Sequence, residues 1–280
     1  MTVIAITGST GHIGRAVADQ LADLSPTLVV RDATKAPTIT GSRLVITDYA
    51  DASNSVRALT GVDVLFMVSA SESKFRRVQH RTFIEAAAAA GVSHIVYTSF
   101  FGAHPAAVFT LGRDHADAEA AIRASGVTFT LLRDNFYSDL LPFFADDSGV
   151  IRGPAGDGRV AAVARADVAD AAAAILRNPA AHAGVTYELT GPEALSLDEV
   201  ASRAGAVIGR TLSYEPENVD EAYLSRAHYG AEQWQLDAWV TTYTAIADGE
   251  TERVTDHVER VSGHSARTIE EALNAQRPAA

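Results

Sequence analysis

The sequence predicts an α/β protein with a doubly wound parallel sheet that helices cover on both faces. Short runs rich in β-branched residues alternate with longer alanine-rich segments through the first two thirds of the 280 residues. The short runs are almost continuously apolar, which is typical of strands buried on both faces. Several alanine-rich segments are followed by glycine, the residue that most often ends a helix. Such an alternation, joined by right-handed crossovers, builds a doubly wound sheet.

The elements of the first half follow in a regular order. Strands are expected at residues 2–7, 27–31, 44–47, 62–69, 94–99 and 127–132. Helices are expected at 13–24, 53–59, 75–90 and 114–124, with Gly61, Gly91 and Gly126 at C-cap positions. The third of these helices carries a basic run that we interpret as a solvated face, formed by Lys74, Arg76, Arg77 and Arg81.

After Asp134 the alternation loosens. The expected elements are an aromatic helix at 135–144, a glycine-rich loop at 148–158, a helix at 166–176 and a strand at 185–189. Ser196 and Glu199 have the spacing of a capping box that opens a helix at 197–208, followed by a strand at 212–214 and a helix at 232–247. We expect one domain over residues 1–155, to whose sheet 160–190 returns, and a smaller, mostly helical domain over 191–280.

Composition excludes several classes of protein. The chain has no cysteine, so disulfides, thiolate metal sites and a cysteine nucleophile are excluded, and no histidine–carboxylate spacing predicts a metal site. No apolar run approaches the roughly 18–20 residues that span a bilayer, and no basic leader opens the chain, so we expect a cytoplasmic protein without membrane contact. The formal net charge of −12 argues against nucleic acid as a partner. Residues 156–280 contain 10 basic and 20 acidic side chains, which also disfavours an acidic substrate.

The strongest motif lies between the first expected strand and helix, in the run Thr7-Gly8-Ser9-Thr10-Gly11-His12-Ile13-Gly14. Gly8 permits a tight turn, Gly11 lets backbone N–H groups approach a pyrophosphate, and Gly14 lets the helix pack closely on the strand. The first turn of the helix adds unsatisfied N–H donors and a partial positive charge. This context predicts a dinucleotide site formed by residues 8–14, and the alternative is a purely structural turn.

The residues at the end of the second strand discriminate between NAD and NADP as the dinucleotide. NAD sites usually carry an acidic residue there for the ribose 2′-hydroxyl, whereas the 2′-phosphate of NADP needs a cation. Arg31 can bind a phosphate through two parallel N–H bonds, and Lys35 adds a second positive charge, which favours NADP(H). Asp32 keeps NAD(H) open as the alternative. Asp48, after the third strand, can contact the adenine amino group or can be an ordinary turn aspartate.

Several segments together resemble a known family. They are the Gly8-x-x-Gly11-x-x-Gly14 turn, Arg31 with Lys35, the Tyr97-Thr98-Ser99 run, and segments 131–137 and 155–167. Over residues 2–215 the chain resembles the NmrA-like atypical short-chain dehydrogenases, and within them most the type 2 NAD(P)H:quinone oxidoreductases and the triphenylmethane reductases. The resemblance implies a Rossmann-type NAD(P)-binding domain and NADPH-dependent reduction of quinones or cationic aromatic dyes, with the substrate held between this domain and the C-terminal one. Val68 and Ser69, which end the fourth strand, are expected to complete the cofactor site.

The catalytic pair of the wider superfamily is missing. That pair is Tyr-x-x-x-Lys, in which the lysine charge lowers the tyrosine pKa. The two lysines here, Lys35 and Lys74, have no tyrosine four residues earlier. The family's spacing places His115 at the position of the lysine and Leu111 at the position of the tyrosine. We therefore expect direct hydride transfer to an acceptor that needs little proton assistance. His115 can bond the nicotinamide ribose or give a proton to a quinol oxygen, or it is simply a polar residue in a helix.

Substrate contacts are expected at the ends of the fifth and sixth strands. Ser99 can bond the substrate or the carboxamide, and its alternative is an ordinary strand-end hydroxyl. Flat apolar side chains suit an aromatic substrate, although some of them are expected to be core. The expected set comprises Phe100, Phe101, Asn135, Phe136 and Tyr137.

Two functions remain open from the sequence. The first is an NADPH-dependent reductase of aromatic acceptors, acting as a monomer or homodimer on a small molecule. The second is a non-catalytic, NmrA-type redox sensor that binds NAD(P) and acts through a protein partner. The missing tyrosine–lysine pair fits both functions, whereas the aromatic residues favour the enzyme.

Overall fold

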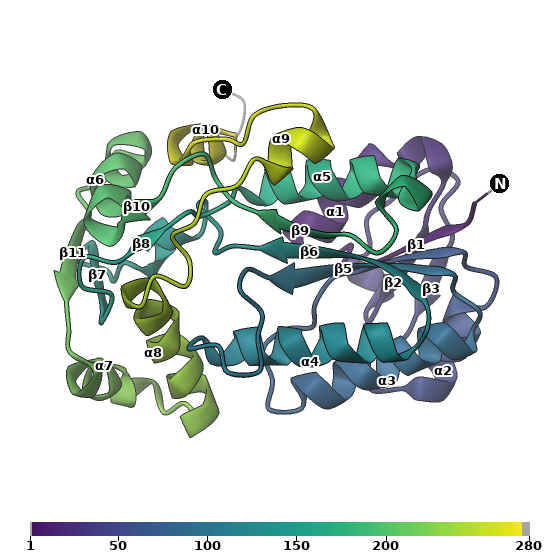
Figure 1. Ribbon diagram of the computed structural model, residues 1–280, viewed down its shortest axis with the longest axis horizontal. Helices are drawn as coiled ribbons and strands as arrows, with labels where there is room; N and C mark the ends of the chain where they lie inside the picture. Colours follow the sequence, from purple (N-terminus) through teal and green to yellow (C-terminus); the bar gives the residue numbers. More distant parts are fainter. Residues whose placement is uncertain (1, 276–280) are drawn as a thin grey trace. The chain divides into compact units, whose positions relative to one another are not determined.

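A seven-stranded sheet forms the centre of the fold in the computed structural model, which describes residues 2–275 (Figure 1). Its strands are β1 (Ile4–Thr7), β2 (Thr27–Val30), β3 (Leu44–Ile46), β4 (Val64–Met67), β5 (His94–Phe100), β6 (Thr128–Asp134) and β9 (Thr186–Leu189). Their order across the sheet is β3-β2-β1-β4-β5-β6-β9. The order reverses between β1 and β4, which is the place where doubly wound sheets bind ligands.

Neighbouring strands of this sheet run parallel. β1 pairs with β2 and β4, β2 with β3, and β4 with β5, all in parallel register. The N–H groups of Leu131 and Asn135 donate to the carbonyls of Val185 and Leu189, so the bonds advance in the same direction along β6 and β9. The predicted doubly wound α/β fold is confirmed.

Helices cover both faces of the sheet. α2 (Ala52–Leu59), α3 (Arg76–Ala89) and α4 (Thr110–Ala124) lie on one face, and α1 (His12–Gln20) and α5 (Arg165–Arg177) lie on the other (Figure 1). Strands β1, β2 and β4 are buried along their whole length, as their continuous apolar runs predict. Short 3-10 helices are η1 (Ala22–Leu24), η2 (Ala33–Lys35), η3 (Leu141–Phe144), η4 (Pro179–His182) and η5 (Ala227–Tyr229).

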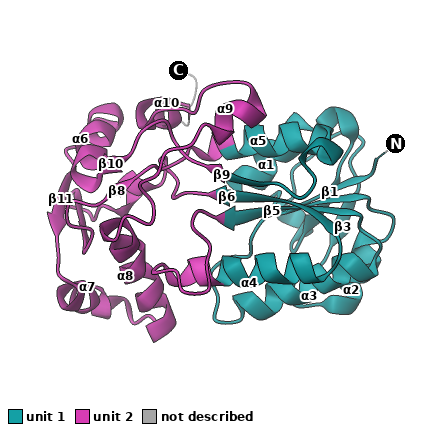
Figure 2. Cartoon of the chain, in the orientation of Figure 1, with its two compact units in different colours: residues 1–99, 114–133, 168–187 teal, residues 100–113, 134–167, 188–280 magenta. Residues whose placement is uncertain are grey.

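The chain divides into two compact units (Figure 2). Unit 1 comprises Met1–Ser99, Asp114–Arg133 and Val168–Tyr187, and unit 2 comprises Phe100–Arg113, Asp134–Asp167 and Glu188–Ala280. Both units are discontinuous: unit 1 includes residues 168–187, which lie within the 160–190 segment expected to return to the sheet, and unit 2 includes residues 100–113 and 134–167 as well as the C-terminal part. The reason lies in packing, because Phe109 and Leu111 join a cluster with Ala238 and Ala245 of the later helix α8 (Gln233–Ala247).

Within the described residues, unit 2 contains two small sheets and several helices. β7 (Val150–Gly153) pairs in parallel with β11 (Ser213–Pro216), and β8 (Arg159–Val160) pairs antiparallel with β10 (Leu195–Ser196). Besides α8, the helices are α6 (Leu197–Ile208), α7 (Val219–Arg226), α9 (His257–Ser262) and α10 (Ile269–Asn274). Ser196 and Glu199 form the predicted capping box of α6. No helix within residues 2–275 combines the length and the apolar character needed to cross a bilayer.

The segment after β6 is not the aromatic helix that the sequence predicts. Only η3, which contains Pro142, is helical between residues 135 and 144. The backbone of Tyr137 instead forms a parallel bridge with Val163. The side chain of Asn135 accepts the N–H of Phe136, which favours an extended turn over a first helical turn. The expected loop at 148–158 contains β7, so that prediction is also corrected.

Candidate active site

The glycine turn in unit 1 has the geometry that its sequence predicts. Gly8 has a φ of +64°, in the left-handed region that glycine adopts without strain, and its carbonyl accepts the N–H of Gly11 at 2.9 Å. A Cβ atom on Gly14 would lie 2.4 Å from the Gly8 oxygen. The first turn of α1 therefore packs directly on the backbone that follows β1, and only glycine fits there.

The N-terminus of α1 is open to an anionic ligand. Gly11 is its N-cap residue, and no side chain caps the helix. The hydroxyl of Ser9 is buried and has no hydrogen-bond partner among residues 2–275. Thr10, Gly11 and His12 are exposed. Uncapped N–H donors beside an unpartnered hydroxyl fit the pyrophosphate of a dinucleotide, so the residues present fit the predicted cofactor.

The segment that follows β2 contains two exposed basic side chains and a carboxylate that already accepts hydrogen bonds. Arg31 and Lys35 are exposed. Asp32 accepts the N–H and the hydroxyl of Thr34 at 2.9 and 2.7 Å, which caps η2 and lowers the pKa of its carboxyl. Asp48, after β3, accepts the N–H of Ala50 at 2.8 Å, so it does serve as a turn aspartate, and its contact with adenine stays a prediction.

The loop after β4, residues 68–70, is held by buried side chains. We call it the 68–70 loop. The N–H of Val68 donates to the hydroxyl of Thr7 at 2.9 Å, and its carbonyl accepts the hydroxyl of Tyr49 at 2.6 Å. The N–H of Ser69 donates to the hydroxyl of Thr98 at 2.8 Å. The two residues predicted to contact the cofactor therefore have fixed backbones, because hydroxyl groups from three other segments satisfy their polar groups.

Two side chains of α3 complete this support. The N–H of Ala70 donates to Nε2 of His80 at 2.9 Å, and the carbonyl of Ala70 accepts Nε of Arg76 at 2.8 Å. Both side chains are buried. Burial, together with the Arg76 charge, lowers the pKa of His80 to about 3, so the imidazole stays neutral and accepts the bond. Arg76 does not belong to the solvated face predicted from the basic run, whereas Arg77 and Arg81 are half exposed and pair with carboxylates of α4.

His115 extends the same network. Its Nε2 lies 3.0 Å from Nη2 of Arg76, and its Nδ1 lies 3.0 Å from the hydroxyl of Tyr97. A guanidinium only donates, so Nε2 is the acceptor and Nδ1 carries the proton. Burial and the Arg76 charge lower the pKa of His115 well below its usual value. The side chain is 6% exposed, and its predicted contact with the cofactor or a quinol oxygen stays a prediction.

Ser99 belongs to a second buried cluster. Its hydroxyl donates to Oε1 of Glu119 at 2.6 Å. Glu119 also accepts Nε and Nη2 of Arg133, each at 2.8 Å, and Nη1 of Arg123 at 3.1 Å. Burial by itself would raise the pKa of Glu119, but the bonds from Arg133 and Ser99 bring it below its usual value. The predicted contact of Ser99 with substrate is not tested by this arrangement, in which its proton faces Glu119.

In unit 2, three phenylalanines form an aromatic cluster. The ring centroids of Phe100 and Phe136 lie 4.9 Å apart, and Phe109 lies 4.8 Å from the first and 5.2 Å from the second. Phe109 was not among the predicted residues, because it lies in a segment that the sequence indicates only as a loop. Phe101 is separate, with the guanidinium of Arg253 5.1 Å from its ring centroid.

The polar residues predicted for the substrate have partners within unit 2. Nδ2 of Asn135 donates to the carbonyl of Thr251 at 2.9 Å. The hydroxyl of Tyr137 donates to Oδ2 of Asp134 at 3.1 Å. Asp134 is buried, its Oδ1 has no partner among the described residues, and burial raises its pKa well above the usual value. Asp134 was missed as a titratable group because a strand-end aspartate gives no sign of its burial.

Comparisons with known proteins identify the family of the chain. Residues 8–179 match the NAD(P)H-binding family. The chain is 32% identical to quinone oxidoreductase 2 of Escherichia coli K12 over 283 residues, covering 97% of this chain and 98% of that protein. It is 37% identical over 228 residues to the (4-alkanoyl-5-oxo-2,5-dihydrofuran-3-yl)methyl phosphate reductase of Streptomyces griseus, covering 79% of each.

A solved structure extends the likeness to the fold. The triphenylmethane reductase of a Citrobacter species, crystallised with NADP(H), superposes with a TM-score of 0.84 at 29% identity, covering 97% of this chain and 99% of that one. The chain therefore belongs to the NAD(P)H-binding, NmrA-like family of oxidoreductases, as its sequence motifs predict.

Proposed function

We propose that this protein is an NADPH-preferring reductase that transfers a hydride directly to a quinone or a related aromatic acceptor, such as a triphenylmethane dye. The strongest support is the uncapped α1 N-terminus beside the Gly8–Gly14 turn, because its free N–H donors match a pyrophosphate. The acceptor class is taken from the relatives, which are named for quinones and triphenylmethanes.

The preference for NADPH rests on the end of β2. Oδ1 of Asp32 accepts two hydrogen bonds from Thr34, and Oδ2 lies 4.0 Å from Nζ of Lys35, so this carboxylate already has partners within the chain. Arg31 and Lys35 remain exposed beside it and can pair with a 2′-phosphate. This distribution of charge supports NADP(H) over NAD(H).

The chemistry follows from what the chain contributes. Bound NADPH supplies the hydride. The half-buried Tyr49 and the buried His80 and Arg76 fix the 68–70 loop, where Val68 and Ser69 are proposed to contact the cofactor. His115 is neutral, so it can orient groups by hydrogen bonds but holds no readily released proton. An acceptor whose added electrons spread over a conjugated system needs little proton assistance, and quinones and delocalised carbocations meet that condition.

A turnover assay tests the proposal. Purified protein is mixed with NADPH or NADH and with menadione or crystal violet, and oxidation of the nicotinamide is followed by absorbance. We expect turnover with both acceptors and a higher kcat/KM for NADPH. Tight NADP binding by calorimetry without any turnover above background would overturn the enzyme proposal and support the sensor alternative.

The cofactor preference has its own test in Arg31→Ala. Because Arg31 is proposed to pair with the 2′-phosphate, we expect NADPH affinity to fall roughly tenfold while NADH affinity changes less than about twofold. Arg57→Ala, which removes an exposed arginine of α2, is the matched control. Equal losses for both cofactors would show that Arg31 does not distinguish them.

A further inference from the structure

Unit 2 contains a cavity of about 1090 Å³ that no predicted site residue lines. Its walls come from the 144–148 turn, β7, the segment around the end of α7, and α8. The volume is close to the upper limit, about 1,000 Å³, of typical small-molecule sites. Four aromatic side chains line it, Phe144, Tyr229, Trp239 and Tyr243. The rings of Phe144 and Tyr243 lie 6.2 Å apart, and those of Tyr229 and Trp239 lie 5.8 Å apart at 82°.

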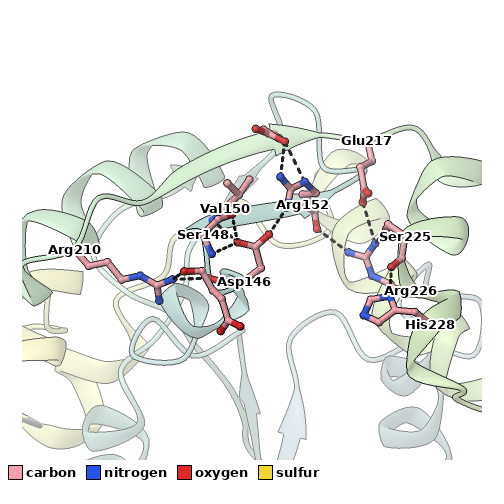
Figure 3. A network of polar contacts seen from close by, with 11 residues as sticks. Asp146, Ser148, Val150, Arg152, Arg210, Glu217, Ser225, Arg226 and His228 are labelled. Carbon is pink, nitrogen blue, oxygen red and sulfur yellow. Dashed lines mark hydrogen bonds and ion pairs between the residues drawn. The ribbon is translucent and has the colours of Figure 1, made fainter.

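One guanidinium in the wall is already bonded on several sides (Figure 3). Arg226 donates through Nη1 to Glu217 at 2.9 Å and through Nη2 to the carbonyl of Arg152 at 2.7 Å. It also lies over the ring of Tyr243, 5.1 Å from the centroid. Its charge is therefore offset by Glu217, and it holds the aromatic wall in place.

The second guanidinium of the wall is also paired (Figure 3). Arg152 forms an ion pair with Asp146, and its Nε and Nη2 lie 3.1 and 3.0 Å from Glu215. Asp146 in turn accepts the N–H of Ser148 at 2.9 Å and that of Val150 at 3.1 Å. These bonds fix the 144–148 turn against β7, so the polar side of the cavity is built before any ligand arrives.

The remaining charge near the cavity is negative. Asp147 is exposed, lines the cavity, and has no ion pair or side-chain hydrogen bond among residues 2–275. Arg210 is not part of the lining, and its guanidinium donates to the carbonyls of Asp146 and Asp147 (Figure 3). The lining and its bonded partners thus hold four carboxylates, Asp146, Asp147, Glu215 and Glu217, against the three guanidinium groups of Arg152, Arg210 and Arg226.

We propose that this cavity binds a flat aromatic molecule that is neutral or cationic and discriminates against anionic ones. The rings supply stacking surface, both guanidinium groups of the lining already have carboxylate partners, and Asp147 adds a negative charge that repels an anion. The proposed site lies wholly within unit 2 and goes beyond the proposed reductase function.

The chain's two tryptophans allow a direct test. Trp239 lines the cavity and Trp234 does not, although both lie in α8. Trp234→Phe leaves Trp239 as the only tryptophan, and Trp239→Phe leaves Trp234. Both variants are titrated with naphthoquinone, with and without saturating NADP⁺, and circular dichroism checks their folding. We expect saturable quenching at least threefold stronger in Trp234→Phe. Equal quenching in the two variants would overturn the cavity proposal.

Charge selectivity is tested with three bicyclic probes, neutral naphthoquinone, cationic N-methylquinolinium and anionic naphthoquinone sulfonate. In calorimetry on the unmodified protein, the affinity for the anionic probe should be at least tenfold lower than the affinity for either of the other probes. Asp147→Asn should weaken the cation about fivefold and leave the neutral probe within about twofold, since one nearby charge is removed. Asp198→Asn, an exposed aspartate at the start of α6, should change neither.

The two proposals fail separately in these experiments. Turnover of menadione without any binding at Trp239 would leave the reductase standing and reject the cavity as a binding site for aromatic molecules. Quenching of Trp239 without turnover would leave the cavity site standing and reject the reductase. Sulfonate binding as tight as that of the neutral quinone would reject the stated charge selectivity.

Discussion

Two buried carboxylates, one in each unit, have opposite protonation behaviour. Glu119 in unit 1 accepts bonds from Arg133, Arg123 and Ser99, which lower its pKa despite its burial. Asp134 in unit 2 accepts a side-chain hydrogen bond from Tyr137, and burial raises its pKa well above the usual value. Both side chains are about 1% exposed, so burial alone does not separate them. The two carboxylates differ in their hydrogen-bond donors, because only positively charged partners compensate for the lost hydration of a carboxylate.

The same contrast extends to the rest of the two units. In unit 1 the 68–70 loop is held by side chains of a buried polar network that includes Thr7, His80 and Arg76. In unit 2 the ion pair of Arg152 with Asp146 in the cavity wall is more than one third exposed, whereas that of Arg226 with Glu217 is largely buried. A buried network fixes a binding surface rigidly, whereas exposed pairs contribute little stability and mainly set the charge that a ligand meets.

The largest expected effect is that of Glu119→Gln. Removing the charge leaves Arg133 without its ionised partner in a buried cluster, so we expect the free energy of unfolding to fall by about 3 kcal/mol at pH 7. Because the folded pKa of Glu119 is lowered, its stabilising contribution is present above the unfolded pKa of about 4.3 and is lost as the pH falls further. Urea unfolding at pH 7 and pH 4 measures both.

The control for that change is Glu85→Gln, which removes an exposed glutamate of α3. It should shift the free energy of unfolding by less than about 0.5 kcal/mol. An equal loss of unfolding free energy in the two variants would mean that the buried cluster of Glu119 contributes no more to stability than an exposed glutamate does.

The second prediction concerns the support of the 68–70 loop. His80→Phe leaves the N–H of Ala70 without its acceptor, so we expect a loss of about 2 kcal/mol in unfolding free energy. We also expect a roughly tenfold weaker affinity for NADPH, measured by calorimetry, because the loop is proposed to contact the cofactor. His80→Gln retains an acceptor and should recover much of the affinity. A variant that loses stability but binds NADPH normally would show that the loop does not position the cofactor.

The third prediction concerns a substitution that should increase the free energy of unfolding. Asp134→Asn should raise the free energy of unfolding by about 1 kcal/mol at pH 7, since the unfolded aspartate ionises freely while the buried one resists ionisation. With a raised folded pKa, Asp134 lowers stability as the pH rises above the unfolded value of about 3.9, and the asparagine lacks this slope. Thermal unfolding across pH 4 to 7 measures it, and the gain should vanish at the acid end. A destabilised Asp134→Asn at neutral pH would contradict this view of unit 2.

Predictions from sequence succeed where neighbouring residues define the structure. The doubly wound parallel sheet follows from continuous apolar runs and the handedness of crossovers, and the turn at Gly8–Gly14 follows from three glycines. They fail at the 135–144 segment, whose aromatic composition indicates a helix. There the backbone of Tyr137 pairs with Val163, a partner that sequence proximity does not reveal.

The sequence by itself determined the doubly wound fold and the dinucleotide turn, because apolar continuity and glycine spacing act within a few residues. Only the tertiary structure decided which charges are buried. Arg76 and Arg77 are adjacent in α3, yet Arg76 turns to the 68–70 loop and His115 while Arg77 is half exposed. Helix geometry sends neighbouring side chains about 100° apart, so what each one meets depends on the elements packed around the helix. The same holds for Asp134, whose burial and missing cation are set by contacts far along the chain.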